Sequence, residues 1–251
     1  AVATVMRAPS LPDTAIPGDD ASIERGRYLV HAGGCISCHE DDDGSLSGGM
    51  AIESPFGTFY ASNITPDPDT GLGGWQGEDF LLALKHGRTP TGSFYFPAFP
   101  YRSYAGVTDD DVLAIAAYLM SQEPVAAATP EHELPGWVER WQMAGWNLLA
   151  DMAETEPVHY DDAQIARGAY LTQSLGHCGE CHTPRNALGI SQQDQAFAGA
   201  DTPDGHVDAI DAAALANWSA DDLALFLFIG LKPDGEYVGG KMEPGIEHNT
   251  S

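Results

Sequence analysis

The four cysteines of this 251-residue chain fall into two identical patterns. On a single helical turn, the spacing in each pattern places two thiols on one side, and the histidine that follows can reach the same region. No cysteine is left for a disulfide framework, so these patterns constrain the fold more than any other feature. Each reads Cys-x-x-Cys followed at once by histidine, and the members are Cys35, Cys38, His39, Cys178, Cys181 and His182.

The histidines decide which kind of cysteine site is present. Cys-x-x-Cys-His is the attachment motif of c-type heme, in which the thiols bond the porphyrin and the histidine binds the iron. The pairs of a zinc ribbon lie about 15–20 residues apart, whereas more than half of the chain separates Cys38 from Cys178. A thioredoxin-type pair needs neither the histidine nor a second copy. We expect two covalently attached heme c groups with His39 and His182 as proximal iron ligands.

The chain also repeats itself, which predicts its domain organisation. A shift of 143 residues carries Cys35 onto Cys178, Trp75 onto Trp218 and Gly92 onto Gly235, with no gap between the heme motif and this glycine. The sequence predicts an all-α fold of two tandem cytochrome c-like heme domains joined by a partly helical linker. We place the first domain at residues 1–124, the linker at 125–158 and the second domain at 159–251.

Apolar periodicity predicts three helices in the first unit. They are expected over Ser22 to Ala32, Gln76 to His86 and Val112 to Ser121, the last opened by Thr108 as its N-cap. Residues 45–74 are rich in glycine and proline and predict a loop without strong strand signals.

The second unit is predicted to be shorter than the first. Ser251 matches Thr108, so the chain stops where the third helix would begin, and we expect that helix to be missing. The helix expected around Gln164 to Leu171 would then expose an apolar face. Either the chain was cut or another element, such as a partner protein, covers that face.

The segment between the units is unusually rich in tryptophan. Trp137 and Trp141 lie four residues apart, on one face if the segment is helical, and Trp146 follows. Such a segment can pack between the heme domains as a clasp. Alternatively, it can form a docking surface for a larger partner or a membrane interface.

The sixth iron ligands differ between the units. Met242 lies in a glycine-rich loop after the second motif, and we expect it to be the distal ligand of the second heme. The same shift places Phe99 opposite Met242, and phenylalanine cannot bind iron. The first heme is therefore either open or bound by another side chain, for which Met50, His86, Met120 and His31 are the candidates.

Charge and hydropathy limit the partners and the compartment. The chain has 37 acidic and 11 basic residues, which gives a formal charge of −26 and disfavours binding to nucleic acid. This charge either promotes solubility or steers a basic partner, for which the run Glu40 to Asp43 is the best local candidate. No apolar run is long enough to span a membrane. Because bacterial heme c is attached in the periplasm, we expect a periplasmic protein whose signal peptide has been removed.

Further strings of the chain include Gly26-Arg27-Tyr28-Leu29-Val30, Asn63-Ile64-Thr65-Pro66-Asp67, Pro97-Ala98-Phe99-Pro100-Tyr101 and Cys178-Gly179-Glu180-Cys181-His182-Thr183-Pro184-Arg185-Asn186. These strings resemble the cytochrome c subunits of periplasmic alcohol, gluconate, fructose and aldehyde dehydrogenases. The resemblance implies an electron-transfer protein that is not itself an enzyme and that works with a periplasmic dehydrogenase, a respiratory acceptor protein or both, in a hetero-oligomer. An alternative is a heme enzyme acting on a small molecule at an open first heme.

Overall fold

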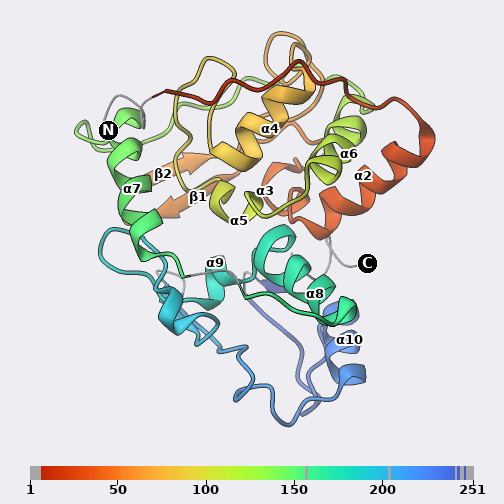
Figure 1. Ribbon diagram of the computed structural model, residues 1–251, viewed down its shortest axis with the longest axis vertical. Coiled ribbons are helices and arrows are strands. Elements are labelled where there is room, and N and C mark those ends of the chain that lie inside the picture. Colours follow the sequence, from red (N-terminus) through yellow and green to blue (C-terminus); the bar gives the residue numbers. More distant parts are fainter. Residues whose placement is uncertain (1–6, 156–157, 203–204, 241, 244–245, 247–251) are drawn as a thin grey trace.

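The chain folds into two helical halves, which lie in the upper and lower parts of Figure 1. The computed structural model describes residues 7–155, 158–202, 205–240, 242–243 and 246. The predicted end of the second unit at 247–251 lies outside these residues. Among the described helices, none combines the length and the hydropathy that crossing a bilayer requires.

Within the described residues, the first half has five helices, and the three longest confirm the predicted helices within a few residues. Asp19 caps α2 by accepting a hydrogen bond from the Ser22 amide, and Thr108 caps α6 by accepting one from the Asp111 amide. Gly87 ends α4 in the left-handed conformation, with φ of 59°. The helices are α2 (Asp20–Ala32), α3 (Ile36–His39), α4 (Gly77–His86), α5 (Tyr101–Tyr104) and α6 (Asp109–Met120).

The core of the first half forms where α2 crosses α6. Gly26 permits the close approach, because a Cβ added there would lie 1.9 Å from the carbonyl oxygen of Ala114. Leu29 and Val112 are fully buried at this crossing. The buried Asp111 accepts a hydrogen bond from Arg25 Nε at 2.6 Å, which satisfies its charge inside the core.

The fold is mainly helical, as predicted, and it also contains two short hairpins that were not predicted. β1 (Ala51–Ser54) pairs antiparallel with β2 (Gly57–Tyr60), and β3 (Ala200–Thr202) pairs with β4 (Gly205–Val207). In the first hairpin Phe59 buries its ring, and Thr58 pairs further with Glu133 from the segment after the first half. This third pairing comes from residues distant in sequence, so local strand propensity could not reveal it.

The second half packs against the first. It contains α8 (Ala163–Ala169), the π-helical turn η2 (Tyr170–Leu175), α9 (Gly179–His182), the short 3₁₀ turn η3 (Gln193–Gln195) and α10 (Ala220–Ile229). Leu175 is fully buried within the core of the first half. Tyr170 and Leu171 pack against the same core, whereas Ile165 stays 57% exposed. The first half therefore covers one end of the face that was predicted to be exposed.

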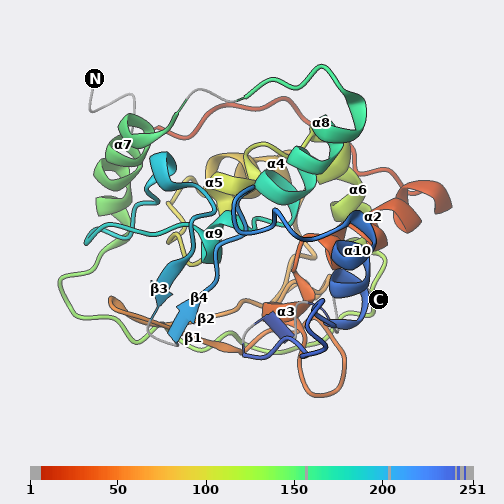
Figure 2. The same cartoon turned by 90° about the horizontal axis from the view of Figure 1, so that it is seen from below.

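The intervening segment contains the 3₁₀ turn η1 (Arg140–Gln142) and α7 (Met143–Ala153). Trp137 precedes η1, so it does not share a helix with Trp141. Trp137 lies instead in a turn, which is closed by a hydrogen bond of 2.8 Å from the Val138 amide to the Pro135 carbonyl. Figures 1 and 2 place α7 and α10 at opposite sides of the molecule.

Candidate functional site

The two Cys-x-x-Cys-His motifs adopt the same backbone conformation. Cys35 and Cys178 each precede a one-turn helix, and each accepts a hydrogen bond at 3.0 Å from the amide of its motif histidine. The amides of Cys38 and Cys181 donate to the same two carbonyls at 3.3 Å. One helical turn therefore brings both thiols and the imidazole of each motif together, as the spacing predicts.

A backbone carbonyl fixes each motif histidine. His39 donates its Nδ1 hydrogen to the carbonyl of Ser62 at 2.6 Å, and His182 donates to the carbonyl of Asp208 at 2.7 Å. Since a carbonyl can only accept, Nδ1 carries the proton and Nε2 keeps its lone pair for a metal. Sequence reasoning missed Ser62 and Asp208, because any residue type can supply a carbonyl.

The four cysteines are free of disulfides in the structure. Burial raises the pKa of the Cys35 thiol to about 12, and burial also raises the pKa of Cys178. Burial lowers the pKa of His39, which keeps its imidazole neutral and able to bind a metal. Each motif thus offers two thiols and one imidazole nitrogen, which is the donor set that covalent heme attachment requires.

Loop lengths differ between the halves although the motifs match. The amide of Gly48 donates to the carbonyl of His39, and the amide of Gly199 donates to that of His182, both at 2.9 Å. These equivalent contacts lie nine residues after the first histidine and 17 after the second. The prediction of a gapless repeat is therefore wrong here, because extra residues after His182 are balanced by a shorter stretch before α10.

After α4 and α10, the two halves return to the same register. The bridge between Arg88 and Phe94 matches the bridge between Leu231 and Tyr237 at the shift of 143. This register leads onward to Phe99 in the first half and to Met242 in the second.

At this register position, Phe99 packs in an aromatic cluster of the first half. Met242 occupies the equivalent position of the second half and is half-buried. The Phe99 ring centroid lies 5.4 Å from that of Tyr95 and 5.7 Å from that of Tyr104. The ring also packs against the core of the first half. This part of the first half therefore presents an aromatic surface at the position equivalent to the predicted methionine ligand.

The other candidate ligands of the first half lie in different surroundings. Met120 packs against the core, and Met50 is 47% exposed. His86 lines a cavity together with Arg102 and Asn147, and burial there lowers the pKa of its imidazole. His31 lies in the last turn of α2, four residues before Cys35.

The structure brings the two motifs together across the contact between the halves. Tyr104 donates its hydroxyl to the carbonyl of Gly33 at 2.6 Å, and its ring centroid lies 5.3 Å from that of His177. Ser103 donates its hydroxyl to Glu180 Oε1 at 2.6 Å. Gly33 and His177 each lie just before a motif, so α5 contacts both. Sequence reasoning missed this contact, because no local pattern pairs α5 with the second half.

Charged side chains around the motifs are engaged within the chain. Arg185 forms an ion pair with Glu180 and donates to the carbonyl of Gly189 at 2.7 Å. In the acidic run after His39, Asp43 accepts a hydrogen bond from the Ser45 amide and Asp41 accepts one from the Ser47 hydroxyl. Asp41 and Asp43 therefore stabilise the turn that follows His39.

Comparison with known proteins decides the family. The cytochrome c family model matches residues 23–123. A diheme cytochrome c-type protein of Cereibacter sphaeroides is 42% identical over 247 residues, which cover 93% of this chain and 81% of the relative. The chain belongs to the cytochrome c family. Heme c is accordingly the cofactor of this cytochrome, and the thiols and imidazoles of the motifs suit it.

Other relatives are subunits of dehydrogenases. The gluconate 2-dehydrogenase cytochrome c subunit of Pantoea cypripedii is 38% identical over 250 residues, which cover 92% of this chain and 56% of the subunit. The fructose dehydrogenase cytochrome subunit of Gluconobacter japonicus is 38% identical over 258 residues, which cover 98% and 52%. The cytochrome thus spans about half the length of these two subunits.

Proposed function

We propose that this chain is a periplasmic diheme c-type cytochrome that passes electrons from a dehydrogenase toward the respiratory chain. The matched geometry of the two motifs carries the proposal. Cys35 and Cys38 would attach one heme with His39 on its iron, and Cys178 and Cys181 would attach the other with His182 on its iron. When bound, each heme supplies one-electron redox chemistry.

The protein's own contribution is to hold the imidazoles. The carbonyls of Ser62 and Asp208 fix the tautomer and the ring orientation of the two histidines, and a hydrogen bond to a ligating histidine also raises its basicity. Met242 would be the sixth ligand of the second heme, where a thioether raises the reduction potential. Its place after the Leu231–Tyr237 bridge supports this role.

The first heme would lack the equivalent ligand, because Phe99 occupies that register position. A heme enzyme with an open first heme remains the alternative function. The segment around Phe99 offers little for acid–base chemistry, since its one charged side chain, Arg102, is paired with Asp151 and Glu154. These ion pairs favour an electron carrier over an enzyme.

The intervening segment has the contacts expected of a clasp. Tyr101 donates its hydroxyl to Asn147 in α7 at 2.8 Å, and Trp146 Nε1 donates to the carbonyl of Leu188 in the second half at 2.8 Å. Arg140 donates to the carbonyl of Phe94 at 2.9 Å. The segment therefore bonds to both halves.

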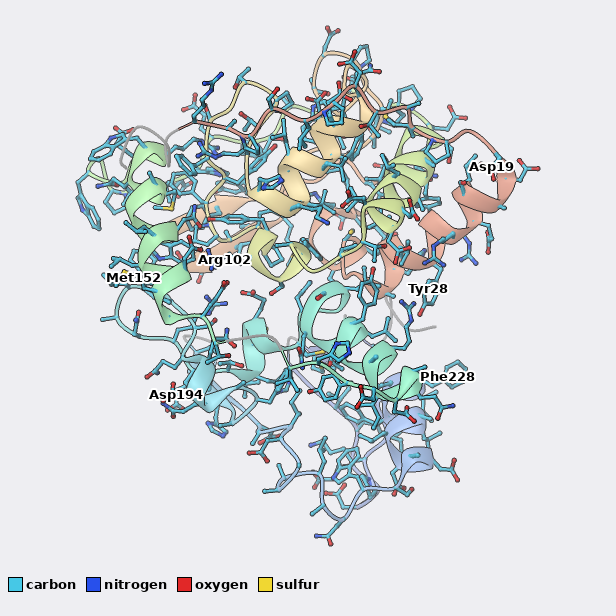
Figure 3. The ribbon with its side chains drawn as sticks, in the orientation of Figure 1. Asp19, Tyr28, Arg102, Met152, Asp194 and Phe228 are labelled. Atoms are coloured by element: carbon cyan, nitrogen blue, oxygen red, sulfur yellow. The ribbon has the colours of Figure 1, made fainter. Side chains whose placement is uncertain are left out.

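The outer face of α7 is apolar, and it would dock the dehydrogenase partner. Leu148, Leu149 and Met152 are exposed by 50%, 47% and 76%, and Trp141 continues the stripe. Figure 3 places Met152 on the outer side of α7 and Arg102 on its inner side. The relatives named as dehydrogenase subunits motivate this choice of occupant.

Heme content and electron exchange test the proposal together. The protein matured in a bacterial periplasm should show two covalent hemes per chain by intact mass. Both should be reduced by a dehydrogenase of the gluconate, fructose or alcohol type in the presence of its substrate, and reoxidised by a respiratory acceptor. A single heme per chain, or two hemes that no such donor reduces, would contradict the proposal.

A further inference from the structure

One side chain in the first half contacts residues that directly precede both heme motifs. Tyr104 is 5% exposed and lies in α5. Its hydroxyl reaches the carbonyl of Gly33, two residues before Cys35, and its ring meets the ring of His177, which directly precedes Cys178. The two rings lie nearly perpendicular, at 82°, in an edge-to-face contact.

Close packing holds this contact in place. Leu175, two residues before His177, is fully buried in the core of the first half. A Cβ added at Gly106 would lie 2.2 Å from Ser174 Oγ, so the chain between α5 and α6 closely approaches η2. Ser103 adds its hydrogen bond to Glu180, which lies between the cysteines of the second motif. The second motif is thereby fixed relative to α5.

We propose that Tyr104 and His177 form the bridge through which electrons pass between the two hemes. The inference rests on the proposed function. In heme c the cysteine sulfurs are bonded to the porphyrin edge, so residues next to the cysteines lie near that edge. Electron tunnelling weakens steeply with distance and less steeply through packed atoms, so a contact that joins the two motifs offers the shorter route.

The step is a simple exchange of one electron. The electron leaves the reduced heme of one motif and arrives at the oxidised heme of the other, and no bond forms or breaks. Tyr104 keeps its proton and its hydrogen bond to Gly33, and burial keeps the pKa of its hydroxyl well above the ordinary value. The two rings act as a medium and are not themselves oxidised.

The variants separate conduction from folding. Tyr104→Leu removes the ring, whereas Tyr104→Phe keeps the ring and removes only the hydroxyl. His177→Asn removes the second ring and suits the backbone, because φ of His177 is 38° and asparagine tolerates this region. Tyr101→Leu is the matched control, because Tyr101 is equally buried in the same helix but bonds to Asn147.

The experiment partly reduces the diheme protein with a radical pulse and follows the redistribution of electrons between the two hemes. Heme content, both midpoint potentials and the near-ultraviolet circular dichroism are measured for every variant. We expect exchange to slow several-fold in Tyr104→Leu and His177→Asn at unchanged potentials, and to stay near the wild-type rate in Tyr104→Phe and Tyr101→Leu.

Failure of the bridge and failure of the proposed function give different results. Wild-type exchange rates in Tyr104→Leu and His177→Asn, with both hemes bound, would overturn the bridge and leave the proposed function standing. Wild-type protein whose two hemes are not reduced by any dehydrogenase donor would instead contradict the proposed function itself.

Discussion

The two halves carry the same glycine in the same sequence context but surround it differently. Gly26 in α2 faces the carbonyl of Ala114 in α6, which leaves no room for a Cβ. A Cβ at Gly168 in α8 would meet no described atom within 4 Å. The repeat therefore preserves the sequence of its first helix, while the structural use of that helix has diverged.

The same contrast extends to the cores. α4 buries Phe80 and Leu81, whereas α10, its counterpart, has no buried residue among those described and leaves Phe228 61% exposed. Figure 3 places Phe228 at the edge of the second half. The motifs nevertheless match in detail, because their geometry depends on one helical turn and one carbonyl. Attachment geometry is local, whereas stability is shared between the halves.

The largest expected effect comes from removing one pair of cysteines at a time. Cys35→Ala with Cys38→Ala should leave one covalent heme per chain, and so should Cys178→Ala with Cys181→Ala. Intact mass and the visible spectrum measure both. A variant that keeps two covalent hemes would show that the matched motifs are not the two attachment sites.

Substitutions at Gly26 and Gly168 should have opposite effects on the free energy of unfolding. Gly26→Ala should lower the free energy of unfolding by about 1–3 kcal/mol or more, because the new methyl group overpacks against backbone. Gly168→Ala should raise it by about 0.5–1 kcal/mol, since alanine favours a helix interior. Urea unfolding monitored by circular dichroism measures both, and equal effects would contradict the difference in packing.

Asp111 should be the main polar link between the halves. It bonds to Arg25 in the first half and to Tyr170 in the second. Asp111→Ala leaves the hydroxyl of Tyr170 without this acceptor, so the free energy of unfolding should fall by about 1–3 kcal/mol. Asp110→Ala, which changes an exposed acid of the same helix turn, is the control and should have the smaller effect.

The smallest expected effect is a pH dependence at the same link. Burial, together with the hydrogen bond to Asp111, raises the pKa of Tyr170 to about 12. Since the unfolded pKa is about 10, the stabilisation by neutral Tyr170 is complete below pH 10 and is lost as pH rises toward 12. The stability difference between wild type and Tyr170→Phe should shrink over that range. A constant difference would contradict the raised pKa.

Sequence reasoning succeeded where the determinants are local. Caps and apolar periodicity predicted α2, α4 and α6, and the cysteine spacing predicted the motif geometry. The pairing of Thr58 with Glu133 was not predicted because Glu133 lies in a distant segment, and the carbonyl of Ser62 was not predicted because any residue type supplies one. The heme motif and the following long helix, α4 or α10, are equally far apart in the two halves. This equal spacing hid a longer stretch after His182 and a shorter stretch before α10.

The visible spectrum of the dithionite-reduced protein, before and after addition of carbon monoxide, tests the central difference between the halves most directly. Since Phe99 stands where Met242 stands in the second half, carbon monoxide should shift about half of the Soret intensity. Met242→Leu should then allow the remainder to shift, while Met120→Leu, a control in the first core, should change nothing. A wild-type spectrum that does not respond would contradict an open first heme, and a spectrum that shifts completely would contradict Met242 as a ligand.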